Sequence, residues 1–449
     1  MTGGGSIDGD LHVRGGTVVL RDGPRRADVL IRAGRVEAVA DVAPPAGVAE
    51  LDASGKLVLP GLIDPQVHFR EPGFPDKEDL ESGARAAIAG GVTAFCEMPN
   101  TRPPTIDPEQ LADKLRRASG RCVADHAFFL GATPENADRL GEWERLPGCA
   151  GVKVFMGSST GTLLVPDDAA LERVLRSGER RVTVHSEDEE RLRERYAAVK
   201  SGASVASHPD VRDVECALRA TRRLLDLVER TGRPVHVLHV STAEELELVR
   251  ERDLGDLVTV EVTPNHLFLA GPECYERHGA LAQMNPPVRD ARHQSALRRA
   301  LVEGPVTCIG SDHAPHTAAE KERPYPDSPS GIPGTQTILP LLLTAVRDGW
   351  LALEDVVRLS VDGPRRVYGI AGKGALDPGT DGDLVIVDPD VTEPLPLEWL
   401  QSRAGWSPYA GTPLAGWPET TVLRGAVVWS RHRPVGAPRG RPLTFESTR

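Results

Sequence analysis

The feature that most constrains the fold of this chain is a regular alternation of short apolar segments with segments of helical pattern. The apolar segments are rich in β-branched and aromatic residues, and helix-patterned stretches such as 79–91 and 213–232 separate them. Eight apolar segments occur: LPGLIDPQVHF (59–69), VTAFCEMPN (92–100), ADHAFFLGAT (124–133), GVKVFMG (151–157), RVTVHSED (181–188), PVHVLHVST (234–242), LVTVEVTPNH (257–266) and VTCIGSDHAPH (306–316). Strands that alternate with helices predict βα units around a parallel sheet. Eight units predict an α/β fold with a (β/α)8 TIM barrel, whose chemistry lies at the C-terminal strand ends.

The two ends of the chain follow a different pattern. Apolar and polar side chains alternate, with Gly and Pro between the runs, in five stretches: 11–20, 27–40, 56–60, 382–390 and 420–430. This alternation predicts strands, and we expect both ends to pair into a small composite β-sandwich. A chain of 449 residues exceeds the size at which single cores stop growing, about 250 to 300 residues. The predicted division is 1–57 for the N-terminal part of the sandwich, 58–374 for the barrel and 375–449 for the C-terminal part.

The composition of the chain argues against some classes of binding partner. The formal net charge of −12 argues against nucleic acid or an anionic membrane, because both require clustered Lys and Arg. The six cysteines are scattered without C-x-x-C spacing, so we expect reduced, buried thiols and no disulfide framework. The N-terminus lacks the pattern of a signal peptide, and no apolar run approaches about 18 residues. A cytoplasmic protein that acts on a small molecule is expected.

Side chains that can bind a metal recur at the ends of the predicted strands. These are His68, Lys153, His185, His239 and Asp312. A single His at a strand end is more often a hydrogen-bonded structural residue. Five nitrogen or oxygen donors at equivalent strand ends instead predict a metal centre of a hydrolase.

Lys153 lies within an apolar strand, where a buried ammonium is costly unless it is paired or chemically changed. Reaction with carbon dioxide would convert the amine into an anionic carbamate that can bridge two zinc ions. The alternative is an unmodified barrel lysine that is paired with Glu97 or with another carboxylate.

The order and spacing of eight motifs resemble those of the class I dihydroorotases of the amidohydrolase superfamily, over nearly the whole chain. The motifs are PGLIDPQVHFREPG, GGVTAFCEMPNT, GVKVFMGSSTG, VHSED, HVLHVST, MNPPVR, GSDHAPH and SGIPGTQT. The resemblance implies a zinc-dependent, reversible hydrolysis of dihydroorotate to N-carbamoyl-aspartate in pyrimidine biosynthesis. It implies one zinc on His68, Lys153 and Asp312, and a second on Lys153, His185 and His239. Lys153 would be carboxylated, and Asp312 would also be the catalytic base.

Substrate choice depends on the residues beside these ligands. Arg70 and Asn100 suit a carboxylate, because a planar guanidinium fork matches two carboxylate oxygens and an amide adds a neutral donor. By the resemblance, His316 is a third carboxylate contact. Asn285 and the backbone around Ser330 and Gly331 would then bind the pyrimidine edge.

The chain departs from the family pattern at the end of the first strand, where most members carry His-x-His and this sequence has Gln66, Val67 and His68. An amide oxygen is a neutral and poorer zinc ligand than an imidazole, so the site holds one or two zinc ions. The set Lys153, His185 and His239 remains complete and is sufficient for a catalytic zinc with an open water position.

Three further histidines are not expected to be ligands. His236 should point away from His239 and pack between barrel and helices, His266 should be structural, and His313 should orient the loop of Asp312. Two segments beside the presumed site, 156–161 and 320–331, are rich in Gly, Ser or Pro and are hypothetical mobile lids.

Two other functions stay open. A hydantoinase, dihydropyrimidinase or allantoinase would share the barrel and most ligands, but it would not need the carboxylate clamp of Arg70 and Asn100. A metal-poor scaffold that assembles aspartate transcarbamoylase is supported only by Gln66. By the resemblance, a homodimer and an association with aspartate transcarbamoylase are expected partners.

Overall fold

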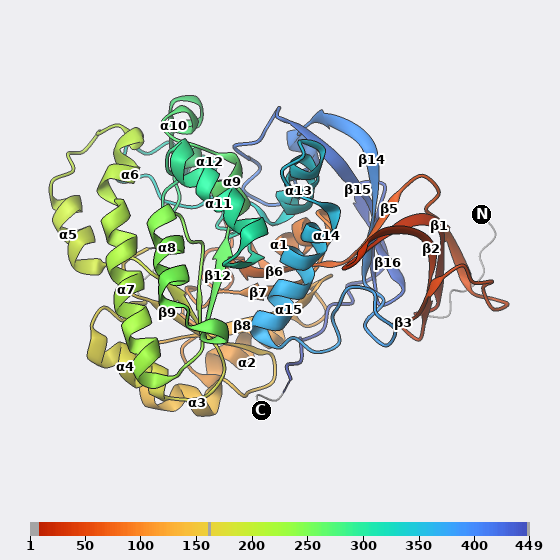
Figure 1. The fold of residues 1–449 in the computed structure, drawn as a ribbon, viewed down its shortest axis with the longest axis horizontal. Helices are drawn as coiled ribbons and strands as arrows, with labels where there is room; N and C mark the ends of the chain where they lie inside the picture. Colours follow the sequence, from red (N-terminus) through yellow and green to blue (C-terminus); the bar gives the residue numbers. More distant parts are fainter. Residues whose placement is uncertain (1–8, 160–162, 447–449) are drawn as a thin grey trace.

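The computed structural model describes residues 9–159 and 163–446, and two bodies are visible in it (Figure 1). A barrel with its helices forms the larger body, and strands from both ends of the chain form a sheet beside it. The predicted fold class, an α/β barrel with a separate sheet built from both termini, is confirmed. In the part of the chain that the structure describes, no helix has the length and apolar character needed to cross a membrane.

The barrel contains the eight predicted strands in sequence order. They are β6 (Leu62–Val67), β7 (Val92–Glu97), β8 (Asp125–Gly131), β9 (Cys149–Phe155), β10 (Val182–His185), β11 (Val235–Val237), β12 (Val258–Val262) and β13 (Val306–Ile309). Neighbouring strands pair in parallel. The ends β6 and β13 meet just beyond β13, where the His68 amide donates to the His313 carbonyl oxygen at 2.7 Å. The barrel is thus nearly closed.

Helices cover the outside of the barrel (Figure 1). The helices are α1 (Leu80–Ala89), α2 (Pro108–Ala118), α3 (Leu140–Trp143), α4 (Asp168–Arg176), α5 (Glu189–Ala197), α6 (His208–Val211), α7 (Val214–Thr231), α8 (Ala243–Arg252), α9 (Pro264–Phe268), α10 (Glu273–His278), α11 (Ala291–Glu303), α12 (Ala318–Lys321), α13 (Ile338–Arg347), α14 (Leu353–Val357) and α15 (Gly363–Tyr368). Many begin at an Asp or Thr whose side chain accepts from a backbone amide of the first turn, as Asp213 does for α7. Such caps satisfy orphan amides and set where each helix begins. The helix-patterned stretches 79–91 and 213–232 are confirmed as α1 and α7.

The second sheet joins both ends of the chain. Its strands are β1 (Leu11–Leu20), β2 (Gly23–Arg32), β3 (Arg35–Ala40), β4 (Ala49–Asp52), β5 (Leu57–Pro60), β14 (Leu384–Pro394), β15 (Pro413–Leu423), β16 (Ala426–Ser430) and β17 (Arg433–Pro434). β5 connects the two ends, because it pairs with β1 on one side and with β14 on the other. The predicted segment 59–69 therefore contains a boundary between the two sheets. Gly61 lies at that boundary, and a side chain there would collide with Thr93.

Two packing layers hold the barrel in shape. Valines such as Val184, Val237 and Val260 face the helices and are fully buried. A second cluster fills the interior and the N-terminal end of the barrel, where Leu443 and Phe445 of the C-terminal segment pack beside Tyr368. All six cysteines are buried and free, as expected.

Candidate functional site

The predicted site residues gather in one small cavity at the C-terminal end of the barrel. Its lining consists of Gln66, His68, Arg70, Asn100, Lys153, Phe155, Ser159, His185, His239, Asn285, Asp312, Ala314, Ser330 and Gly331. His316 lies directly behind this lining, with Nε2 at 3.2 Å from Nη2 of Arg70. The cavity has a volume of about 20 Å³, which accommodates an ion or a water molecule. A ring substrate therefore requires side chains at the mouth to move.

Three of the lining residues have a strained backbone. Arg70, His239 and Asp312 have φ values of 64°, 36° and 47°, in the left-handed region that non-glycine residues rarely adopt. Each stands just beyond the end of a barrel strand, where the chain turns outward. Such strain concentrates at functional sites, where it aims side chains that a regular strand would point elsewhere.

Two imidazoles form one half of the donor set. Nδ1 of His185 lies 3.1 Å from Nε2 of His239. Glu187 has a carboxylate oxygen 2.9 Å from Nε2 of His185 and favours the ring proton there, which leaves the Nδ1 lone pair facing His239. Burial lowers the pKa of both rings, so both are neutral at pH 7 and can act as ligands.

The other half of the donor set surrounds Oδ1 of Asp312. Gln66 donates to this oxygen from Nε2 at 2.9 Å, and Nε2 of His68 lies 3.1 Å away. Nδ1 of His68 lies 2.8 Å from Oδ1 of Asn100, so the ring proton belongs on Nδ1. Burial lowers the pKa of His68. A neutral ring then turns a lone pair toward a carboxylate oxygen, an arrangement that a cation between them would stabilise.

Lys153 lies between these two halves and is only 1% exposed. Its Nζ makes no hydrogen bond or ion pair with the residues that the structure describes, and it lies 4.4 Å from the ring centroid of Phe155. Burial lowers the pKa of Lys153 to about 7. The alternative pairing with Glu97 is not found, because Glu97 binds Lys114 at 2.8 Å. An unpaired amine with a lowered pKa supplies the nucleophile that carbamate formation requires.

The donor chemistry of the cavity fits a divalent metal ion. Neutral imidazoles, a carboxylate and a reactive lysine line the same cavity, and these are donor types that zinc takes. Within residues 9–159 and 163–446, Oε1 of Gln66 and Nδ1 of His239 are buried without a hydrogen-bond partner. Nε2 of Gln66 binds Asp312 and leaves Oε1 without a partner among the described residues, but a neutral amide oxygen is the weakest ligand of the set.

Residues behind the ligands hold them in place, and sequence reasoning missed these. Glu187 fixes His185 and is itself bound by Arg212 at 2.6 Å. Burial raises the pKa of Glu187, but Arg212 and His185 outweigh it, and the net pKa lies well below the ordinary value. Asp64 accepts from the Ser311 hydroxyl at 2.5 Å and so anchors the turn before Asp312. Glu187 stands two residues after His185, and Asp64 stands two residues before Gln66. This spacing could have identified both acids.

Among the described residues that face the expected substrate, Arg70 carries a charge that no carboxylate pairs with. Arg70 is 3% exposed and donates from Nε to the Pro315 carbonyl oxygen at 3.1 Å. Lys77 donates to Nδ1 of His316 at 3.0 Å, so Nε2 of His316 carries the ring proton and donates to the Ser330 carbonyl oxygen at 3.1 Å. The terminal nitrogens of Arg70 therefore have no oxygen acceptor among the described residues, and no carboxylate pairs with them.

Asn285, Ser330 and Gly331 also line the cavity, with Ser330 and Gly331 next to His316. Oδ1 of Asn285 lies 3.0 Å from Nε2 of the buried His208. The predicted lid 156–161 lies partly outside the described residues, and mobility of 320–331 stays a prediction. His266 and His313 have structural contacts, the latter accepting from the Gly334 amide at 3.0 Å.

The prediction for His236 is wrong. This ring lies inside the barrel and not between barrel and helices, because His236 is in register with Thr183, which is in register with Lys153. His236 contacts Glu261 at 3.5 Å and Cys308 at 3.6 Å, forming a buried group of possible metal ligands below the cavity. A second acidic group, Asp125, Asp381 and Asp383, already binds Lys373 and has a structural role between barrel and sheet.

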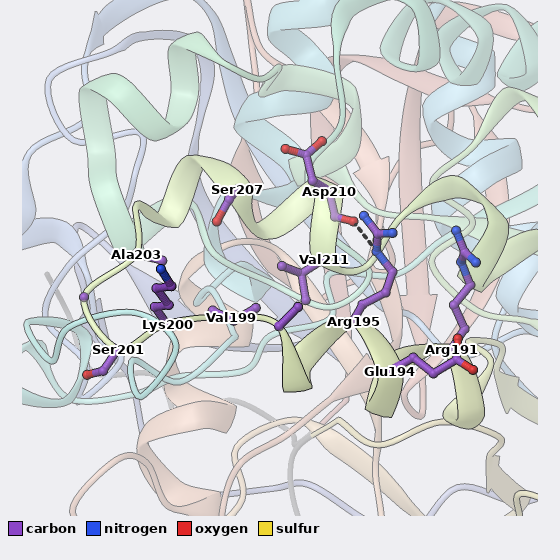
Figure 2. A pocket seen from close by; sticks show the side chains of 12 residues that line it. Arg191, Glu194, Arg195, Val199, Lys200, Ser201, Ala203, Ser207, Asp210 and Val211 are labelled. Carbon is purple, nitrogen blue, oxygen red and sulfur yellow. Dashed lines mark hydrogen bonds between the residues drawn. The ribbon is translucent and has the colours of Figure 1, made fainter.

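A much larger pocket lies away from these residues. It measures about 840 Å³ and is lined by residues of α5, α6 and the loop between them. Figure 2 shows Arg195 directed toward the backbone of Asp210, to whose carbonyl oxygen it donates at 2.8 Å. This pocket shares no residue with the cavity at the strand ends. Size alone therefore does not mark the functional site.

Comparison with known proteins relates the chain to enzymes of one kind. The profile of the amidohydrolase family matches residues 57–428. A dihydroorotase from Methanosarcina acetivorans is 36% identical over 433 residues, covering 94% of this chain and 92% of that protein. An allantoinase from Deinococcus radiodurans is 34% identical over 448 residues, covering 97% and 98%. The structure of the L-hydantoinase (dihydropyrimidinase) from Arthrobacter aurescens has a TM-score of 0.91 at 29% identity, with 97% of this chain and 99% of that chain covered.

The match extends over both bodies of the fold and over every strand end that lines the cavity. The chain therefore belongs to the amidohydrolase family and is a cyclic amide hydrolase.

Proposed function

We propose that the enzyme is a dihydroorotase, which reversibly hydrolyses (S)-dihydroorotate to N-carbamoyl-L-aspartate in pyrimidine biosynthesis. The observation that carries this proposal is the buried guanidinium of Arg70, which faces the cavity without an acidic partner. Burial lowers the pKa of Arg70 to about 10, yet the group remains charged at pH 7. A buried charge is costly unless it is paired, so the site is built for an anionic ligand.

The carboxylate of dihydroorotate supplies that charge. Arg70 would bind its two oxygens through the terminal guanidinium nitrogens, with Asn100 and His316 on either side. The ring would then extend toward Asn285 and the backbone of Ser330 and Gly331, which also line the cavity.

The residues that would hold zinc are His68, Lys153 and Asp312 for one ion, with Gln66 as a doubtful ligand, and Lys153, His185 and His239 for another. Lys153 would be carboxylated, and the site takes one or two ions. When bound, zinc supplies a nucleophilic hydroxide at neutral pH and polarises the ring carbonyl.

Asp312 would be the catalytic acid and base. Its Oδ1 accepts from Gln66, whereas Oδ2 makes no hydrogen bond with the described residues and is available for a proton. Asp312 would take a proton from the attacking water and deliver it to the departing ring nitrogen, and the reverse transfer closes the ring.

The rival activities are those of an allantoinase or a hydantoinase, the names of two relatives described above. Neither allantoin nor hydantoin carries a carboxylate of the kind that Arg70 would bind. A metal-poor scaffold is disfavoured, because all five predicted donor residues line the same cavity. The homodimer, the association with aspartate transcarbamoylase and the cytoplasmic location stay predictions.

The test compares substrates in wild type, Arg70→Ala and Arg70→Lys, each loaded with zinc. We expect dihydroorotate to be turned over faster than hydantoin, dihydrouracil or allantoin. Arg70→Ala should raise KM for dihydroorotate by about 100-fold or more, because it removes a buried charge partner. Arg70→Lys should recover only part of the loss, since a point charge lacks the fork. A wild type that prefers an uncharged ring, with Arg70→Ala equally active on it, would overturn the proposal.

A further inference from the structure

Lys321 is a buried lysine whose hydrogen bonds with the described residues all go to carbonyl oxygens. It ends the short helix α12 and is 3% exposed. Its Nζ donates to the carbonyl oxygens of Gln283 at 3.1 Å, Pro329 at 2.9 Å and Gly331 at 3.0 Å. No carboxylate lies within ion-pair distance of it among the described residues. Burial and the nearby Arg70 lower the pKa of Lys321 to about 7, whereas three acceptors favour the ammonium, since only that form has three protons to donate.

The three acceptors belong to two separate segments that form one wall of the cavity. Gln283 is two residues before Asn285, and Gly331 is itself part of the lining, next to Ser330. Hydrogen bonds to a charged donor are stronger than those between neutral groups. One ammonium thus holds together the two segments that line this part of the cavity.

Gln283 completes the connection between these segments. Its side chain donates to the Ser328 carbonyl oxygen at 2.9 Å and accepts from the Ser328 hydroxyl at 2.6 Å. The Gly331 amide donates to the Gln283 carbonyl oxygen at 2.9 Å, the same oxygen that Lys321 binds. Gly331 cannot be replaced by a larger residue without strain, because its φ is 146° and a Cβ would lie 2.4 Å from the Ala314 carbonyl oxygen. Each contact restricts the same short stretch of backbone.

The helix that carries Lys321 also supports the carboxylate side of the cavity. Glu320, the preceding residue, binds Lys77 at 2.8 Å, and Lys77 donates to His316. Thr317 and Glu320 form a capping box that holds α12 in place. The two adjacent side chains, Glu320 and Lys321, therefore support neighbouring parts of the substrate cavity.

We propose that Lys321 is a positioning residue for ring recognition, which holds the backbone of Gly331 and the segment of Asn285 at the distance that the substrate ring requires. It touches neither the reacting atoms nor the metal ligands. This inference rests on the proposed function for the identity of the ring, but the connection between the two segments does not depend on it. Misplacing substrate contacts by about 1 Å can reduce catalysis by about 100-fold.

The test uses Lys321→Met, which retains the length of the side chain and removes its donors, and Lys321→Gln, which retains two donors. We expect Lys321→Met to raise KM for dihydroorotate by about tenfold or more, with kcat and zinc content changed by less than about threefold. Lys321→Gln should fall between Lys321→Met and wild type. Leu342→Ala in α13 is the control. It removes a fully buried side chain that does not line the cavity, so it should lower stability. It should leave KM unchanged.

Hydrogen exchange without substrate separates this inference from the proposed function. Lys321→Met should speed exchange at the Gly331 amide and in 328–331, and Leu342→Ala should not. If wild type turns over a different cyclic amide, the proposed function fails, and KM for that ring should still rise in Lys321→Met. Unchanged exchange at Gly331 together with an unchanged KM would overturn the inference. Equal losses of kcat and of zinc would do so too, since they would indicate a general structural role.

Discussion

Gln66 is the residue at which this site departs most from an ordinary zinc centre. Its Nε2 donates to Asp312, and its Oε1 has no partner in the described part of the chain. The amide thus orients Asp312 by a hydrogen bond. We infer that Gln66 serves Asp312 first and the metal second.

Replacing Gln66 by His should strengthen metal binding, because an imidazole is a better zinc ligand than an amide oxygen. Gln66→His should retain more zinc per chain than wild type after dialysis against a fixed concentration of a weak chelator. Gln66→Ala should retain no more than wild type. Zinc analysis of the three proteins in parallel checks this, and equal zinc in Gln66→His and wild type would show that position 66 does not limit the site.

Single residues also show where pattern reasoning fails. The prediction that His236 and His239 point to opposite faces assumed a regular strand, but β11 ends at Val237. His239 then adopts a φ of 36°, so alternation no longer applies between the two rings. The contacts of His236 depend on the pairing of β11 with β12 and of β12 with β13. No local sequence pattern contains this information.

Strands and helices were more predictable than side-chain directions. All eight barrel segments and most of the terminal strands follow from apolar periodicity and from Gly and Pro punctuation, whereas β4 and β17 were not predicted. The boundary between β5 and β6 was predicted only approximately, because the predicted stretches 56–60 and 59–69 overlap. Only the pairing partners, β1 and β14 for β5 but β7 for β6, separate the two strands.

The C-terminal segment is an element whose role no pattern indicated. Residues 440–445 cross the N-terminal end of the barrel, where Leu443 donates its amide to the His126 carbonyl oxygen at 2.8 Å. The Leu443 side chain joins the buried cluster inside the barrel and is 4% exposed. This segment closes the end of the barrel opposite the site.

Leu443→Ala should therefore lower the free energy of unfolding by about 2 to 5 kcal/mol, through lost burial and a cavity at the barrel end. Val435→Ala in the same region of sequence is the matched control, since Val435 is 38% exposed and should cost less than about 0.5 kcal/mol. Urea unfolding of both variants measures the difference. Similar values for the two would mean that the segment does not seal the barrel.

At the scale of the whole molecule, buried neutral histidines connect stability to pH. Burial lowers the pKa from 6.5 to about 3 for His208 and His316, and to about 4 for His266 and His293. A histidine whose pKa is lower in the folded than in the unfolded protein contributes fully to stability above the unfolded pKa of 6.5. This contribution is lost as pH falls toward the folded-state pKa. Glu97 acts in the opposite direction, because burial raises its pKa to about 7.

Among the described residues, buried histidines with a lowered pKa outnumber buried carboxyls with a raised pKa, so Tm should fall steadily as pH decreases from 6.5 to 5. His208→Gln removes one titrating ring of α6, so its Tm should decline less steeply than that of wild type over the same range. Loss of zinc in acid affects both proteins equally and cancels in the comparison of slopes. Scanning calorimetry at half-unit steps of pH provides the measurement, and parallel curves would exclude a contribution from His208.

The sequence alone determined the class of fold and the identity of nearly every residue in the cavity. Periodicity of side chains along the chain is local information, and it specified the barrel strands, the terminal strands and the polar residues that follow each strand. The tertiary structure decided what those residues do to one another. It left Arg70 without an acidic partner, placed Glu187 behind His185 and brought Lys321 between two distant segments. Such relations depend on strand closure and on burial, because charge and hydrogen-bond energies are set by the three-dimensional surroundings of a group and not by its neighbours in sequence.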